Sequence, residues 1–224
     1  MTSLLQQRSQ LPSAEALSAG VSTSALSFDV RVLQQLSFIP NLCDLLLTRQ
    51  VHALEHATIW VLSGASPPLT LTATDYRSYS LTRSDNGQLS GFSTPQGFYL
   101  TGDVSPQALR RASAIALKRL NGGEWDLAIH PRCGTNLPIA LTLTAGAVVA
   151  AHLALPRRPL DQILGFVGAT ALAAAIAPAV GAMAQKYVTT AVPTNLAIDG
   201  VYPVYDGDPE PQNHKQFVRV RWVD

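Results

Sequence analysis

The segment His52-Ala53-Leu54-Glu55-His56 carries the residues best suited to chemistry. In a helix, positions i, i+3 and i+4 share one face, so both imidazoles and the carboxylate would point the same way. Two histidines one turn apart can bind a single Zn²⁺ ion, and the adjacent glutamate could accept a proton from a water molecule. The pattern predicts metal ligands at His52 and His56 and a catalytic general base at Glu55.

A second candidate segment is His130-Pro131-Arg132-Cys133-Gly134-Thr135-Asn136. His130 and Cys133 have a spacing common among metal ligands in turns, and the proline and glycine favour a sharply bent backbone. We expect His130 and Cys133 to complete a Zn²⁺ site, with Thr135 and Asn136 orienting substrate or the groups that surround the ligands. Four protein donors would make the site structural, whereas three donors and a water would make it catalytic. The sequence leaves both open.

Simpler interpretations exist for these residues. A helical histidine at a membrane surface can be an interfacial residue with ordinary hydrogen bonds, in which case there is no metal site. His152 is either a haem or pigment ligand or another interfacial histidine. Cys43 is expected to be a small buried apolar residue.

Local signals predict the elements that must position these residues. Asn41 can cap a long helix that Gly64 ends. Ser105 and Pro106 open another helix, which closes at residues 122–123. A short helix is expected at residues 28–39. Strands and turns are expected over residues 65–104, with a hairpin turn at 86–87. A short strand is expected at 126–130, and an edge strand in the segment FVRVRWV.

Composition adds a membrane component. Charged residues make up 14% of the 224 residues and hydrophobic ones 47%, whereas a soluble domain carries about 25% charged residues. Residues 137–155 and 163–184 contain no charged residue. Each run is long enough to cross a hydrocarbon core roughly 30 Å thick, and small residues in the second favour close helix packing in lipid. We expect a two-helix transmembrane hairpin, and the alternative is a pair of buried helices in a soluble protein.

The predicted fold class is therefore α+β, with a small globular α/β domain in front of the transmembrane hairpin and a short β tail behind it. The tail is expected to pack on the globular domain. The predicted organisation is a disordered tail at residues 1–27, the globular domain with the metal site at 28–136, the hairpin at 137–186 and the C-terminal tail at 187–224.

The expected partners are the lipid bilayer and a membrane protein that packs on the small residues of the hairpin. The net charge of +1 gives no indication of nucleic-acid binding. The N-terminus lacks the apolar core of a secretory signal, which favours a cytoplasmic globular domain. The positive charges that bear on orientation are divided, with Lys118, Arg119, Arg132 and Lys186 on the globular side and Arg157 and Arg158 between the runs.

The segments HALEHATI, GFYLTG and HPRCGTN, followed by two apolar runs, resemble an uncharacterised membrane-protein family found mainly in cyanobacteria. The resemblance covers roughly residues 30–190 and implies a plasma or thylakoid membrane protein. A more distant likeness is to a bacterial family of unknown function with an HGAEHKTI-like segment and an HPRCGT-like turn. The order His-x-x-Glu-His is also similar to that of inverted zincin metallopeptidases. Their third ligand, a downstream helical glutamate, is not evident here, so His130 or Cys133 would have to replace it.

Three functions remain open from the sequence. The first is a membrane-anchored, zinc-dependent hydrolase or peptidase acting at the membrane surface. The second is a non-enzymatic assembly or scaffold factor whose metal is structural. The third is a protein whose histidines bind haem or chlorophyll.

Overall fold

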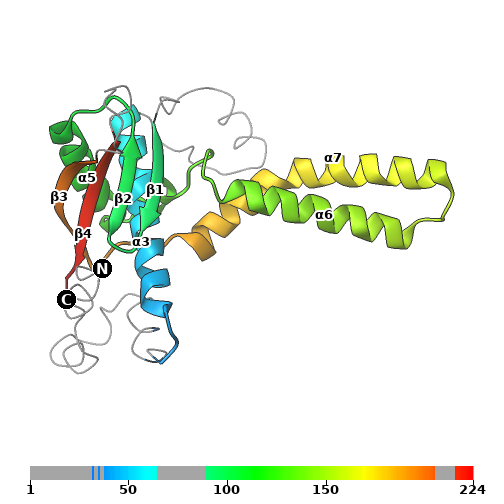
Figure 1. Cartoon of the computed structure of the whole chain (residues 1–224), viewed down its shortest axis with the longest axis horizontal. Coiled ribbons are helices and arrows are strands. Elements are labelled where there is room, and N and C mark those ends of the chain that lie inside the picture. The colour runs from blue at the N-terminus through cyan, green and yellow to red at the C-terminus, as the bar shows by residue number, and fades with distance from the viewer. Residues whose placement is uncertain (1–31, 33–34, 36–37, 65–88, 205–214, 224) are drawn as a thin grey trace.

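The computed structural model describes residues 32, 35, 38–64, 89–204 and 215–223. A four-stranded antiparallel sheet in the order β1-β2-β4-β3 carries helices on one face, and a hairpin of two long helices projects from this body (Figure 1). This arrangement confirms the predicted α+β fold class. The elements are α3 (Leu42–Ser63), β1 (Ser90–Thr94), β2 (Gly97–Thr101), α5 (Pro106–Asn121), η1 (Trp125–Ala128), α6 (Asn136–Ala154), α7 (Pro159–Ala184), η2 (Gln185–Thr189), β3 (Leu196–Val204) and β4 (Lys215–Trp222).

Helix α3 is the central element of the body. It lies against β1 and β2 on one side and against α5 on another, so most of its side chains from Leu46 to Trp60 are buried. Gly64 ends the helix as predicted, with φ at 64°, a conformation that glycine adopts without steric cost. Asn41 precedes the first turn, but its side chain makes no capping hydrogen bond.

Helix α5 follows the sequence prediction closely. Ser105 caps it by accepting a hydrogen bond from the Ala108 N–H, and Pro106 occupies the first position. The prediction of a strand at residues 126–130 was wrong. Residues Trp125–Ala128 form a 3₁₀ turn, because the chain must reverse within a few residues between α5 and the segment that leads into α6.

The sheet joins two distant parts of the chain. Strands β1 and β2 form a hairpin, and β4 pairs antiparallel with both β2 and β3. The expectation that FVRVRWV is an edge strand was therefore wrong, since β4 lies between two neighbours. Val218 and Val220 face the core, while Arg219 and Arg221, at the alternate positions, face outward. That alternation is the same for an edge strand and for a central strand with one solvated face.

Helices α6 and α7 form the antiparallel hairpin seen at the right of Figure 1. Both are long and apolar enough to cross a membrane. No residue of α6 is buried, and in α7 only Ala173, Gly181 and Ala182 are. The helices correspond to the predicted runs, except that α7 begins earlier, at Pro159, a residue suited to a first helical position. Pro178 lies inside α7, a position that membrane helices tolerate better than soluble ones.

The base of the hairpin is tied to the body through amides. The buried Gln185, at the end of α7, accepts a hydrogen bond from the His130 N–H at 2.8 Å. Its Nε2 donates to Asn136 Oδ1 at 2.9 Å, and Asn136 Nδ2 donates to the Pro131 carbonyl at 2.8 Å. Gln185 therefore connects the exit of the hairpin to the turn that precedes its entry.

Several sequence predictions lie outside the described residues. These are the disordered tail at 1–27, nearly all of the helix at 28–39, and the strands and turn over 65–88.

We predict that Gln185→Ala lowers the free energy of unfolding by roughly 1–3 kcal/mol, because it removes the buried acceptor of the His130 N–H and the donor to Asn136. Chemical unfolding of the full chain in detergent, followed through the fluorescence of the buried Trp60, measures this. The control Gln107→Ala, on the exposed side of α5, should change stability by less than about 0.5 kcal/mol. Equal effects from the two variants would contradict the bridging role of Gln185.

Candidate metal centre

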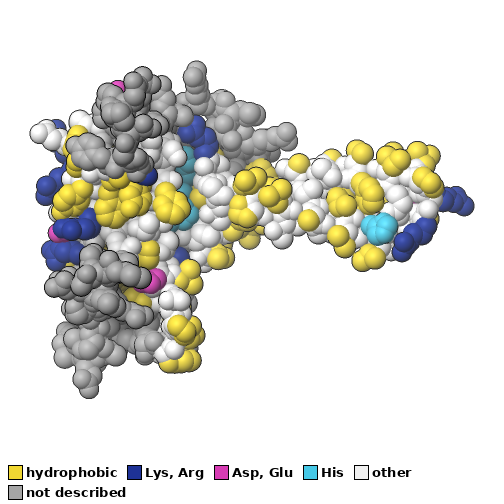
Figure 2. Space-filling view, in the orientation of Figure 1, with side chains coloured by type: hydrophobic (Ala, Val, Ile, Leu, Met, Phe, Trp, Pro, Cys, Tyr) yellow, Lys and Arg dark blue, Asp and Glu magenta, His cyan; other side chains and the backbone are white. Residues whose placement is uncertain are grey.

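His52 and His56 lie one turn apart on α3, and their ring centroids are 4.3 Å apart. The helix places both on the side that faces the turn before α6 and the segment after α7. In Figure 2, histidine side chains appear where the body meets the base of the hairpin. The predicted sharing of one helix face is therefore observed.

Backbone carbonyls determine the tautomer of both rings. His52 Nδ1 lies 3.0 Å from the Thr189 carbonyl, and His56 Nδ1 lies 2.7 Å from the Ala128 carbonyl. A carbonyl oxygen only accepts hydrogen bonds, so each Nδ1 carries the proton and each Nε2 keeps a lone pair. Metal-binding histidines use this arrangement, in which the second nitrogen donates to a carbonyl or carboxylate and orients the ring.

Burial also keeps both imidazoles neutral. It lowers the pKa of His52, against the opposing effect of the Thr189 carbonyl. It lowers the pKa of the fully buried His56 further, and the charges of neighbouring His52 and His130 add to that shift. Neutral imidazole is the form that binds a metal ion.

Cys133 supplies a sulfur beside these nitrogens. Its Sγ lies 3.3 Å from His52 Nε2. The Thr135 backbone N–H donates to the sulfur at 3.4 Å, and the Thr135 hydroxyl lies 3.2 Å from it. Burial raises the pKa of the Cys133 thiol, and the Thr135 contacts oppose that rise. Both contacts from Thr135 hold the Cys133 sulfur in place.

The donor set fits a zinc ion. His52, His56 and Cys133 each offer one donor atom, and these atoms all lie within 4.8 Å of one another. Zinc–ligand bonds of ~2.0–2.3 Å in a tetrahedron place the donors about 3.3–3.8 Å apart. The His52–Cys133 separation already has that value, and a shift of roughly 1 Å would bring in the remaining donor. Imidazole with thiolate is a combination typical of zinc.

His130 lies next to this group without belonging to it. Its ring centroid is 5.5 Å from that of His56 and 5.0 Å from that of Trp60. The Arg132 N–H donates to His130 Nδ1 at 3.3 Å, which leaves the ring proton on Nε2. His130 as a metal ligand stays a prediction.

Glu55 is buried between α3 and β1. It accepts a hydrogen bond from the Ser93 hydroxyl, and its carboxyl lies so close to Gly91 that a Cβ there would collide with it. Burial raises the pKa of Glu55 from 4.5 to about 7, and the Ser93 hydrogen bond opposes that rise. Its charge raises the pKa of Cys133, as expected of a carboxylate near the sulfur.

Sequence reasoning missed several residues that support the site. Thr189 and Ala128 act through backbone carbonyls, which leave no trace in residue type. Gly91 and Ser93 had a faint signal, since they are small residues at alternate positions of a predicted strand. Gln185 had a clearer one, as a polar residue directly after an apolar run.

The other candidates lie apart from the site. His152 is near the far end of the hairpin, where its Nδ1 lies 2.8 Å from Gln162 Oε1. Cys43 is partly buried at the start of α3 and packs against the hydrophobic core, in keeping with its expected apolar role. Asn136 donates a hydrogen bond to the Pro131 carbonyl and accepts one from Gln185 Nε2.

Fold and site together define an α+β protein with a projecting apolar helical hairpin and a His/His/Cys group, able to hold a metal ion, at its base. The chain matches the model of a family described as a domain of unknown function, DUF6391, over residues 47–201, and it belongs to that family. It is 46% identical over 198 residues to an uncharacterized protein of the cyanobacterium Picosynechococcus sp. PCC 7002, covering 88% of this chain and 91% of that protein. No solved structure matches the chain. These relationships agree with the resemblance to an uncharacterised cyanobacterial family.

We predict about one zinc ion per chain in detergent-purified protein, measured by elemental analysis. The double variant His52→Ala/His56→Ala should lose the metal, because two of the three donors disappear. The control His152→Ala removes a histidine far from the group and should keep the metal. Loss of zinc from both variants, or from neither, would contradict the ligand assignment.

The raised pKa of Glu55 predicts a pH-dependent stability of the metal-free protein. A carboxyl whose pKa is higher in the folded state stabilises that state below pH 4.5, and this stabilisation is lost as the pH rises towards 7. Glu55→Gln removes the titration, so its stability relative to wild type should rise by about 2 kcal/mol between about pH 5.5 and pH 8. Urea unfolding of both proteins in chelator measures the difference. A difference that does not depend on pH would contradict the burial of Glu55.

Proposed function

We propose that the protein is a membrane-anchored zinc protein that hydrolyses a substrate at the membrane surface. The observation that carries the proposal is the group of three donors, in which both histidines are oriented by backbone carbonyls. Three protein donors are typical of catalytic zinc sites, whereas structural sites are closed by four. The comparisons with known proteins supply no reaction, so the proposal depends on the site alone.

The hairpin supports the membrane part of the proposal. Helices α6 and α7 expose nearly all of their apolar side chains. Exposing so large an apolar surface to water is unfavourable, whereas lipid would cover it. We propose that they span the plasma or thylakoid membrane, with the globular domain in the cytoplasm. Lys118, Arg119, Arg132 and Lys186 favour this orientation, while Arg157 and Arg158 at the opposite end oppose it.

Each residue of the site would have its own role in hydrolysis. A zinc ion held by His52, His56 and Cys133 would lower the pKa of a bound water towards ~7. Glu55, whose carboxyl accepts a hydrogen bond from Ser93 and lies against Gly91, would act as the general base. Thr135 would hold the Cys133 sulfur in place. His130 would pack beside His56 in the hydrolase, whereas His130 as a fourth ligand would close the site and make the metal structural.

A non-enzymatic role is the second candidate, and one observation favours it. The hydrogen bonds of His52, Gln185 and Asn136 join α3, the turn before α6 and the segment after α7. A metal ion at this junction would also fasten the hairpin to the body. In that case the protein would be an assembly or scaffold factor whose hairpin packs against partner helices in the membrane.

Substitution of Glu55 separates the two candidates. On the hydrolase proposal, Glu55→Gln keeps the zinc and lowers chelator-sensitive cleavage of a fluorogenic peptide library by about 10²-fold or more. Gly91→Ala should also lower cleavage while keeping the zinc, because the new methyl group displaces the carboxyl. The matched control Glu124→Gln alters an exposed glutamate of the same domain and should leave cleavage unchanged.

The scaffold role makes the opposite prediction for the same variants. Glu55→Gln would then matter little in cells, whereas His52→Ala would destabilise the junction. Full function of Glu55→Gln in a cell that requires the protein would refute the catalytic role of Glu55.

A further inference from the structure

A group of exposed apolar side chains lies where the hairpin leaves the body. Tyr187 and Val188, in η2 directly after α7, are 65% and 64% exposed. Leu45, in the first turns of α3, is 59% exposed, and Met183, in the last turn of α7, is exposed as well. We call these four residues the base patch. Exposed apolar patches on a folded protein mark contacts with another protein or with a membrane.

Hydrogen bonds hold the parts of the base patch side by side. The Arg49 guanidinium donates to the Tyr187 carbonyl at 3.4 Å and to the Thr190 carbonyl at 3.2 Å. Leu45 lies one turn before Arg49 on the same face of α3, because residues four apart in a helix are neighbours. The segment that carries Tyr187 and Val188 therefore packs against α3 about one turn from Leu45.

The start of α3 is apolar on more sides than packing on the body requires. Residues 38–47 contain a single charged residue, Asp44. Leu46 and Leu47 are buried in the body, whereas Leu45 and the preceding Phe38 are exposed. A helix that packs on a protein by one side usually carries polar residues on the other. The exposed apolar side chains of this segment therefore indicate a second apolar environment.

The residues after α7 are of the types found at a membrane interface. The Lys186 ammonium lies 5.8 Å from the centre of the exposed Tyr187 ring. Tyrosine is enriched at the level of the lipid headgroups, and a lysine there keeps its stem in apolar surroundings and its ammonium in water. Because both residues follow the apolar span directly, the headgroups are the environment expected around them if α7 crosses a bilayer.

The base patch also faces the direction in which the hairpin projects. In Figure 1, α3 runs up the picture while the hairpin points to the right. Figure 2 shows hydrophobic side chains along the lower right edge of the body, below the hairpin. If the hairpin crosses a bilayer, this edge of the body lies against the bilayer surface. A protein partner would have to enter the space between the body and the bilayer to cover it.

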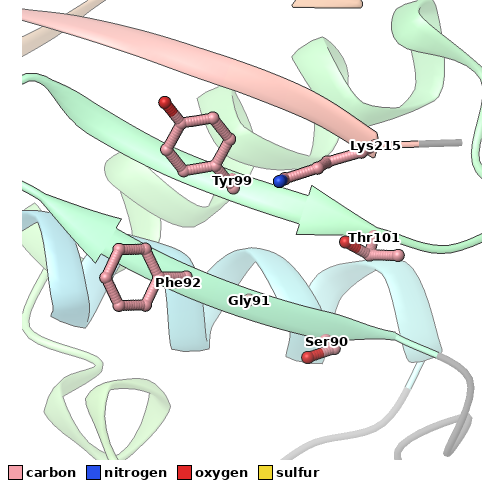
Figure 3. A pocket seen from close by; sticks show the side chains of 6 residues that line it. All are labelled: Ser90, Gly91, Phe92, Tyr99, Thr101 and Lys215. Carbon is pink, nitrogen blue, oxygen red and sulfur yellow. The ribbon is translucent and has the colours of Figure 1, made fainter. Parts of the chain in front are cut away.

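The outer face of the sheet is a separate surface. One aromatic residue from each strand lies in a row across the sheet, because these residues are paired in register. The aromatic row consists of Phe92, Tyr99, Phe217 and Tyr202. Phe92 and Tyr99 line a hollow there together with Lys215 (Figure 3). In Figure 1 this face is turned toward the viewer rather than along the hairpin, so the aromatic row does not continue the apolar span.

We propose that the body rests on the lipid bilayer through the base patch, with Leu45, Tyr187 and Val188 inserted at the boundary between headgroups and acyl chains. Interfacial segments bury their apolar side chains about 5–10 Å into this boundary. The proposal rests on the membrane span proposed above for the hairpin, and it does not depend on hydrolysis. His52 follows Leu45 on the same face of α3, so this contact would set the height of the metal-donor group above the membrane.

Quenching of added tryptophans by brominated phosphatidylcholine tests the proposal, with a single full-length chain in each nanodisc. Leu45→Trp and Val188→Trp place a fluorophore on each of two elements of the patch. The matched control Ile115→Trp replaces an exposed apolar residue of α5, which lies on the far side of the body from the hairpin. The three native tryptophans are common to all variants, so each difference from wild type reports the added residue.

We expect the brominated lipid to quench the added fluorescence by at least about half at positions 45 and 188, and by less than about a tenth at position 115. All three substitutions replace exposed side chains, so the unfolding midpoint should stay at that of wild type. Quenching at positions 45 and 188 that is as weak as at position 115 would overturn the proposal.

Two further measurements separate the causes of such a failure. Val149→Trp, at an exposed position of α6, reports whether the hairpin itself lies in lipid. Quenching at position 149 alone would overturn only the contact of the base patch, whereas no quenching at any position would overturn the membrane span as well. Protection of positions 45 and 188 from aqueous acrylamide without quenching by the lipid would show that protein covers the patch, and this too would overturn the proposal.

Discussion

Two imidazole N–H groups on a buried helix need acceptors that the helix itself cannot provide, and the rest of the site follows from how they are satisfied. His52 and His56 use the carbonyls of Thr189 and Ala128, one after the hairpin and one before it. An unsatisfied buried donor would cost roughly 1–3 kcal/mol, so each contact holds its backbone segment against α3. The same contacts leave both Nε2 atoms free to bind a metal ion. The position of the hairpin and the chemistry of the site therefore have one physical cause.

Glu55 shows a related constraint on the sheet. A buried carboxyl is costly unless it is protonated or hydrogen-bonded, and here a hydroxyl on β1 partly offsets that cost. The carboxyl also needs space, which only a residue without a side chain at position 91 provides. Strand β1 is thus adapted to α3 on its inner face through Gly91 and Ser93. Its outer face carries Phe92, which belongs to a different surface.

The molecule has three regions that differ in their chemical environment. The hairpin exposes apolar side chains without charge, the outer face of the sheet exposes aromatic rings with cations, and the metal-donor group is enclosed between them. Each is carried by different elements, so a change at one surface need not disturb the others. The junction at Gln185 is the exception, because it contacts both the hairpin and the turn that carries Cys133.

Much of the architecture could be predicted from local sequence, because local signals are strong there. Spacing alone placed His52 and His56 on one face of α3. Capping residues at both ends of α5 predicted where that helix begins and ends, and two uncharged runs identified α6 and α7. The structure brings Cys133 close to those histidines, although no local pattern states the distance between segments 81 positions apart in the chain. By contrast, the turn at Trp125–Ala128 and the central position of β4 were not predictable, since alternation does not reveal which strands are neighbours.

Only the tertiary structure decided which nitrogen of His52 and of His56 faces away from its carbonyl partner, and where Glu55 is held. It also decided that the His130 ring packs 5.5 Å from that of His56. These properties depend on backbone carbonyls and on close approaches such as that of Gly91, which residue type does not encode. The aromatic row is the clearest case. Its four members are ordinary strand residues in the sequence, and only the pairing register of the four strands brings them into one line.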